Sequence, residues 1–196
     1  MSKYTDVLNN YYDEEDISLY DDEYIAFECK PKKSAFVLNS CLTLAPFALI
    51  WLFFDLSFIF ATWKEMSAIW FFIIPFFAVH LMPVWLWIGS MINSSKNWNK
   101  TVYYVTNRRV ILLYGFQAIK YIEVFYSDVE SVEIKRSGMD KTFNVGDIHL
   151  KIDDDKKIII ESILDIENYE EVYNKIKSFK KEVKEKKGEK EVLPKE

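Results

Sequence analysis

The chain has 196 residues, of which 50% are hydrophobic and 17% aromatic, and its net charge is −5. The acidic excess belongs to Met1–Glu28, which holds nine acidic residues and one basic residue, whereas the rest of the chain has a net charge of +3. The chain has no basic stripe, which disfavours nucleic-acid binding, and its only cysteines, Cys29 and Cys41, are too few for a metal site and poorly placed for a structural disulfide.

Residues 1–33 are predicted to form an acidic N-terminal arm with one short β-like segment at 23–30. This segment, Glu-Tyr-Ile-Ala-Phe-Glu-Cys-Lys, contains residues that favour strands, and Pro31 ends it. Lys32 and Lys33 then lead into the most hydrophobic part of the chain.

Two long uncharged runs follow the arm and predict a transmembrane helical hairpin. Ser34–Phe54 has 21 residues without charge, and Ala68–Ile92 has 25 residues whose only ionisable side chain is that of His80. At about 1.5 Å per helical residue, either run can cross a hydrocarbon core of about 30 Å. We therefore expect transmembrane helices at about 34–58 and 68–92 within the segment 34–92, with the first acting as an uncleaved signal anchor.

Basic residues near the span ends predict the orientation of the hairpin. The segments before the first span and after the second are rich in lysine and arginine, whereas the connector contains only Lys64. Cytoplasmic loops of membrane proteins carry an excess of these residues. The sequence therefore predicts a multi-pass protein of the plasma membrane with both termini in the cytoplasm and a short external connector.

Asp55 and His80 are the two ionisable side chains placed within or beside the spans. Asp55 is either an intramembrane carboxylate that handles ions or protons, or a residue at the outer end of the first span, and the extent of the uncharged run favours the second. His80 either carries protons or hydrogen-bonds a neighbouring helix, which is the commoner role of a lone histidine in a membrane.

Beyond Ile92 the pattern changes to short alternating runs that predict an antiparallel β meander. Asn107-Arg108 is expected to turn the first hairpin and Ser137-Gly138 to make a later turn, and a bulge is expected in the fourth run. The predicted strands lie within 101–106, 109–115, 120–126, 128–135, 148–152 and 157–161.

The C-terminal part returns to helical periodicity. Apolar residues recur at Tyr169, Val172, Tyr173, Ile176, Phe179 and Val183, which predicts a helix that lays one stripe on the meander. The following residues are mostly lysine and glutamate, so 181–196 is predicted to be a disordered tail.

The order of these features resembles the bacterial pleckstrin-homology (PH) domain membrane-protein family. The resemblance rests on two spans followed by Trp98, on Tyr-Val-Thr-Asn-Arg-Arg-Val-Ile at 104–111, and on the segments 126–132 and 145–148. It implies an α+β membrane protein whose residues 98–180 form a cytoplasmic PH-like barrel or sandwich. In such a fold, two antiparallel sheets of seven strands in all are capped by a C-terminal helix.

No constellation in the chain predicts catalysis. His149 has no partner identifiable from sequence, and the acidic turn 153–155 lacks the glycine and distal glutamate of a calcium loop. No metal or cofactor is predicted. The candidate ligands of anionic lipid headgroups are Arg108, Arg109, Lys120, Lys135 and Arg136, although Arg109 is more simply explained by pairing within the sheet and Arg108 by exposure in a turn.

The sequence therefore predicts a non-enzymatic integral membrane protein whose PH-like domain is an interaction or scaffold module. Its expected partners are the lipid bilayer and a protein or second copy of the chain. The alternative is an accessory subunit of a transporter or channel that uses Asp55 and His80. An enzyme based on His149 would require a carboxylate and a pocket beside that residue.

Overall fold

The computed structural model describes residues 17–62, 70–115, 120–154 and 157–192. The chain divides into two compact units. One consists of Lys33–Trp98 and is helical, and the other consists of the chain on either side of it and contains the sheets. The external connector predicted between the spans, with Lys64, falls on 63–69 and lies outside the described residues.

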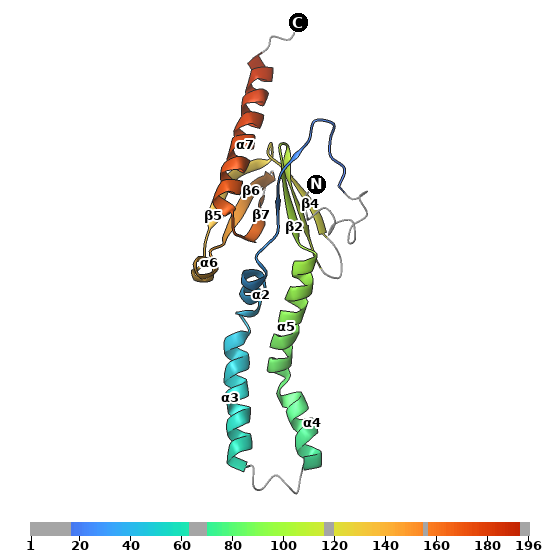
Figure 1. Ribbon diagram of the computed structural model, residues 1–196, viewed down its shortest axis with the longest axis vertical. Helices are drawn as coiled ribbons and strands as arrows, with labels where there is room; N and C mark the ends of the chain where they lie inside the picture. The colour runs from blue at the N-terminus through green and yellow to red at the C-terminus, as the bar shows by residue number, and fades with distance from the viewer. Residues whose placement is uncertain (1–16, 63–69, 116–119, 155–156, 193–196) are drawn as a thin grey trace. The chain divides into compact units, whose positions relative to one another are not determined.

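In the helical unit, the residues described on either side of 63–69 form four helices rather than the two long ones predicted. They are α2 (Lys33–Cys41), α3 (Ala45–Thr62), α4 (Trp70–His80) and α5 (Met82–Asn99), as Figure 1 shows. The first break comes just before Pro46, which lies in the first turn of α3, where a proline costs no helical hydrogen bond. The second break comes just before Pro83 and bends the chain by 53°. Pro75 lies inside α4 without ending it.

The break between α4 and α5 leaves main-chain carbonyls that indole groups satisfy. The N–H of Val84 donates to Leu81 rather than to His80. The His80 carbonyl instead accepts a hydrogen bond of 2.7 Å from Nε1 of Trp51 on α3. Trp85 donates in the same way to the carbonyl of Ala78, at 3.2 Å. Two indole side chains therefore supply hydrogen bonds to main-chain carbonyls beside this break.

The described residues of the other unit form seven strands in two antiparallel sheets. The first sheet has the order β1-β2-β3-β4, and the second has the order β5-β6-β7. The six strands predicted after residue 100 and the β-like segment 23–30 all form strands, which confirms the α+β fold class. Their bounds are β1 Ile25–Cys29, β2 Val102–Thr106, β3 Arg109–Tyr114, β4 Lys120–Phe125, β5 Val129–Lys135, β6 Gly146–Asp154 and β7 Lys157–Ile166.

Strand β1 pairs with β2 across the whole helical insertion. Cys29 lies opposite Tyr103 and Ile25 opposite Thr106, so the chain leaves the sheet, forms the helical unit and returns to the neighbouring strand. The sequence predicted both strands but not this pairing. The register also shifts between Val129 and Ser131 of β5, at the bulge predicted there.

A short helix replaces the turn predicted at Ser137-Gly138. In α6 (Gly138–Phe143), the N–H of Asp140 donates to Oγ of Ser137, while the Asp140 carboxylate accepts from the Ser137 N–H. This capping box starts the helix, and Asn144, which has a left-handed φ of 52°, ends it. The predicted turn is wrong here because the Ser-x-x-Asp capping interaction starts a helix at Gly138.

Helix α7 (Tyr169–Val192) completes the hydrophobic core. The predicted stripe is confirmed, because Val172, Ile176 and Phe179 are buried with residues of both sheets, including Leu112 and Ile163. In Figure 1, α7 lies along β5 and β6. The helix continues to Val192, through most of the segment predicted to be a disordered tail, and a Lys181–Glu185 pair of 3.6 Å supports this part.

Candidate functional site

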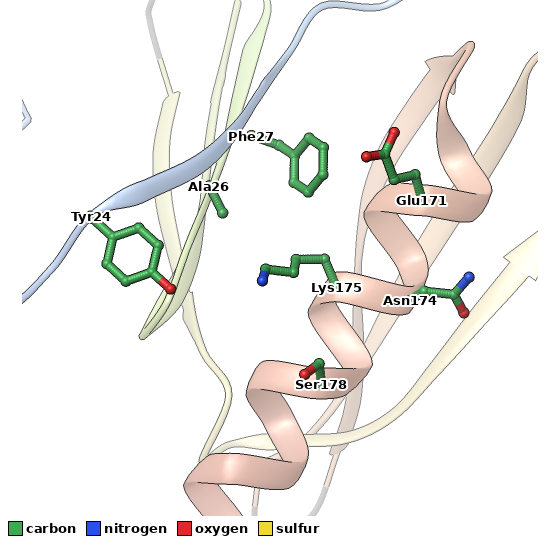
Figure 2. A pocket seen from close by; sticks show the side chains of 7 residues that line it. All are labelled: Tyr24, Ala26, Phe27, Glu171, Asn174, Lys175 and Ser178. Carbon is green, nitrogen blue, oxygen red and sulfur yellow. The ribbon is translucent and has the colours of Figure 1, made fainter.

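A groove runs between strand β1 and helix α7. Its volume is about 580 Å³. Figure 2 shows side chains from the β1 segment on one side and from α7 on the other. The lining residues are Tyr24, Ala26, Phe27, Glu171, Asn174, Lys175 and Ser178.

The spacing of residues along α7 builds one wall of this groove. The wall residues Glu171, Asn174, Lys175 and Ser178 recur every three or four positions, so they share one face of the helix. This face lies beside the buried stripe that anchors α7 to the sheets. The helix therefore presents an apolar face to the core and a polar face to the groove.

The opposite wall is the edge of the first sheet. In the order β1-β2-β3-β4, strand β1 pairs with β2 on one side only. Tyr24 is 54% exposed, and its ring meets that of Phe179 edge-on at 6.2 Å between centroids. Nζ of Lys175 lies 4.7 Å from the centre of the same Phe179 ring. The groove thus combines aromatic surface with a sheet edge.

Acidic residues extend from the groove along the first turns of α7. A second hollow of about 610 Å³ shares Glu171 and Asn174 with the groove and also includes Glu167 and Glu170. Glu167 forms an ion pair of 2.7 Å with Lys32. Burial, together with the charges of Glu28 and Glu171, raises the pKa of the Cys29 thiol on β1 to about 12. Glu170 and Glu171 therefore add two carboxylates at this end of the groove.

Arg109, a predicted headgroup ligand, is instead buried inside the sheet domain. Its side chain is 2% exposed and forms ion pairs with Glu23 at 2.9 Å and Glu123 at 2.6 Å. Burial would lower its pKa, but the hydrogen bonds with the two carboxylates raise it. Arg109 is therefore unavailable to a headgroup, which agrees with the simpler explanation given above, that it pairs within the sheet.

The carboxylate of Glu23, the buried partner of Arg109, has a lowered pKa. Burial alone would raise its pKa, but hydrogen bonds from Thr106, the main-chain N–H of Tyr20 and Arg109 lower it. Nη2 of Arg109 also donates a hydrogen bond of 2.6 Å to the carbonyl of Ser18. The end of the acidic arm is thus fastened to the β2–β3 hairpin.

The other four basic candidates do not converge on one site. Arg108 pairs with Asp22 of the arm at 2.6 Å, and both side chains are exposed. Lys120 is exposed opposite Tyr114, at the end of β3 remote from Arg109. Lys135 is exposed opposite Asp147 at the end of β5. Nε of Arg136 donates a hydrogen bond of 2.8 Å to the carbonyl of Val145, and the guanidinium of Arg136 lies over the Tyr169 ring.

Within the helical unit, Asp55 and His80 come together. Nδ1 of His80 lies 2.8 Å from Oδ1 of Asp55. The Asp55 side chain is 5% exposed, and its Oδ2 has no hydrogen-bond partner among the described residues. Asp55 lies within α3, which continues to Thr62, so the helix does not end beside this residue. His80 does hydrogen-bond a neighbouring helix, as predicted.

His149 lies on β6 with polar neighbours on both sides. It is opposite Glu133 and Ser162, and its Nδ1 lies 2.7 Å from Oγ of Ser162. Burial and the charge of Lys135 lower its pKa, outweighing the opposing effect of Asp147 and Glu133. His149 lines neither of the two hollows described above.

The groove was missed because it combines segments far apart in sequence. Tyr24 and Lys175 are separated by the entire helical unit and by the seven strands that the described residues form. A signal for half of it was present, since the 3.6-residue period that predicted the buried face of α7 also defines the neighbouring polar face. The opposite charges of the acidic arm and of Arg108 and Arg109 could also have predicted that these segments pair.

Two solved structures that are similar to parts of this chain contain PH domains. A solved PH-domain protein of the DUF1696 family from Shewanella loihica PV-4 is 19% identical, with a TM-score of 0.33, over 41% of this chain and 70% of its own. A PH domain from Shewanella amazonensis SB2B is 16% identical, with a TM-score of 0.30, over 39% of this chain and 63% of its own, which is less than two thirds of that relative.

No curated protein matches the chain. The family model described as Bacterial PH domain matches residues 35–180, which is most of the chain. The chain therefore belongs to the Bacterial PH domain family.

Proposed function

We propose that this chain is a non-enzymatic integral membrane protein whose PH-like domain is a cytoplasmic module for interaction with proteins and lipid headgroups. The observation that carries the proposal is the apolar surface of the helical unit. Large apolar side chains of α3 and α4 are 71% exposed at Phe53, 88% at Phe60 and 84% at Phe71. Exposed apolar surface on this scale requires a partner, and a bilayer is the simplest one.

Helix length supports the same proposal. Among the described residues, Ala45–Thr62 is long and apolar enough to cross a membrane. The helices Phe71–His80 and Met82–Asn99, which are bent by 53° at their junction, are together long and apolar enough to form a second span. Lysines at both ends of the unit, including Lys33 and Lys96, favour cytoplasmic termini. The proposed localisation is the plasma membrane.

The sheet domain supports a role in binding rather than in catalysis. The groove beside β1 offers a binding surface of about 580 Å³, whereas the headgroup candidate Arg109 is paired internally with Glu23. Exposed lysines such as Lys120 and Lys135 contribute about 1 kcal/mol each if they lie near anionic lipid, which orients a domain without a specific pocket. The proposed partner is a protein, with a second copy of the chain included in that class.

Fractionation tests the membrane proposal. After cell lysis, the full chain is expected in the high-speed pellet, to stay there in alkaline carbonate and to dissolve in mild detergent. A C-terminal epitope is expected to resist protease added to intact cells and to be digested in inverted vesicles. Recovery in the carbonate supernatant would exclude integral insertion, and digestion from outside intact cells would exclude the proposed orientation.

A second candidate function is that of an accessory subunit to a transporter or channel. The contact of 2.8 Å between Asp55 and His80 favours it, together with the second Asp55 carboxylate oxygen, which has no partner among the residues that the structure describes. Vesicles with the wild-type chain, Asp55→Asn or His80→Gln are compared for flux driven by a membrane potential. Equal flux in all three would remove this candidate and leave the first intact.

A further inference from the structure

The groove between β1 and α7 has a sheet edge on one side and a helix on the other. We propose that it binds an extended, basic peptide segment, which adds to β1 as a further strand and comes from the cytoplasmic juxtamembrane region of another membrane protein. The inference rests on the proposed function, which supplies the membrane location.

Backbone pairing is the first part of the argument. Because β1 is the outer strand of the first sheet, one of its edges faces the groove side rather than another strand of that sheet. An exposed edge is a template for an added strand, whose main-chain hydrogen bonds give affinity without regard to side chains. Helix α7 restricts this template to a chain that fits a groove of about 580 Å³.

Side chains of the groove supply the second part. Ala26 projects little from the strand, between the larger Tyr24 and Phe27 (Figure 2). Alternate residues of an added strand point to the same side, so every second residue of the segment would face this apolar surface. The bound segment is therefore expected to alternate between apolar and polar residues.

Charge supplies the third part and identifies the occupant. Glu170 and Glu171 are both exposed on α7, whereas Glu167 is already paired with Lys32. Lys175 is the basic residue in the lining. The acidic end favours a basic segment, and the cytoplasmic segments beside transmembrane helices are the ones enriched in lysine and arginine.

Peptide selection on the full chain tests the proposal. The chain is placed in nanodiscs of phosphatidylcholine, a library of random twelve-residue peptides is displayed against it, and empty nanodiscs remove peptides that bind lipid. Enriched peptides are expected to alternate apolar and polar residues and to carry lysine or arginine toward one end. Failure to enrich any sequence, or enrichment of acidic sequences, overturns the proposal.

Binding of the best enriched peptide is then compared between two matched variants. Glu171→Gln removes one charge at the groove, and Glu185→Gln removes one on the same helix outside it. The first is expected to weaken binding about three-fold, as loss of an exposed ion pair does, and the second to leave it unchanged. Equal affinities for the two variants contradict the charge argument.

The strand argument is tested on the peptide, so that folding of the protein is not disturbed. Methylation of two main-chain nitrogens that face β1 is expected to weaken binding about ten-fold or more, while methylation of the two alternate nitrogens has a smaller effect. Equal effects of the two methylation patterns exclude strand addition.

The fractionation experiment separates the two levels of proposal. A chain that stays in the membrane but selects no peptide refutes the groove inference alone. A chain found in the supernatant refutes the proposed function, and with it the assignment of juxtamembrane segments as the occupant.

Discussion

The guanidinium of Arg109 on β3 donates two hydrogen bonds to the carboxylate of Glu23 on the N-terminal arm. Nε donates to Oε1 at 2.9 Å and Nη2 donates to Oε2 at 3.0 Å. Neither side chain is more than 2% exposed. This bidentate pair joins residues 86 positions apart and fixes where the acidic arm ends on the sheet.

Replacement of Arg109 by methionine is expected to lower the free energy of unfolding by about 3–5 kcal/mol, because the buried carboxylate of Glu23 and the partly exposed one of Glu123 lose their shared cation. Arg108→Met is the control, since its ion pair with Asp22 is exposed and contributes at most about 1 kcal/mol. Urea unfolding of both variants in detergent, followed by circular dichroism, measures the difference. Similar midpoints would show that the buried pair does not hold the arm.

The lowered pKa of Glu23 predicts a specific dependence of stability on pH. Its contribution is complete above its ordinary value of 4.5, and it is lost as the pH falls through the lower folded value. The stability difference between the wild type and Glu23→Gln is therefore expected to shrink below pH 4.5.

Glu28 provides a control of opposite sign, because burial raises its pKa. Its ionisation opposes folding, so Glu28→Gln is expected to stabilise the protein at neutral pH and to have less effect as the pH falls. Unfolding midpoints measured from pH 3 to pH 7 test both variants, and parallel curves would contradict the assignment.

Gly146→Ala is expected to destabilise the sheet domain. A methyl group on Gly146 would lie 2.6 Å from Cγ of Tyr169, and such overpacking costs about 1–3 kcal/mol. Gly138→Ala places its methyl group where no atom lies within 4 Å, so it is expected to be neutral or slightly stabilising. If thermal unfolding midpoints of the two variants coincide, the close approach of α7 to β6 is wrong.

The Asp55–His80 contact is expected to couple α3 to α4. A double-mutant cycle of Asp55→Asn and His80→Gln should give a coupling free energy of about 0.6–1.7 kcal/mol, in the range of hydrogen bonds between membrane helices. Unfolding in mixed detergent micelles provides the measurement. Additive single effects would mean that the two side chains do not interact.

Local patterns in the sequence determined most of the secondary structure. The period-two runs gave the strands, and the 3.6-residue stripe from Tyr169 to Val183 placed the buried face of α7. These properties depend on residues close together in the chain, which is why they can be recognised without a structure. The short segment Thr-Asn-Arg-Arg, at 106–109, likewise indicated the family from sequence alone, and the Bacterial PH domain model matches the residues around it.

Contacts between distant segments were decided only by the tertiary structure. The sequence left open whether Arg109 is exposed or buried, because the answer depends on Glu23, which reaches it only when β1 pairs with β2 across the helical unit. The contact between Asp55 and His80 and the groove between β1 and α7 depend likewise on long-range packing. The sequence determines the chemical type of each side chain, but its exposure and its partners depend on which distant residues the fold places beside it.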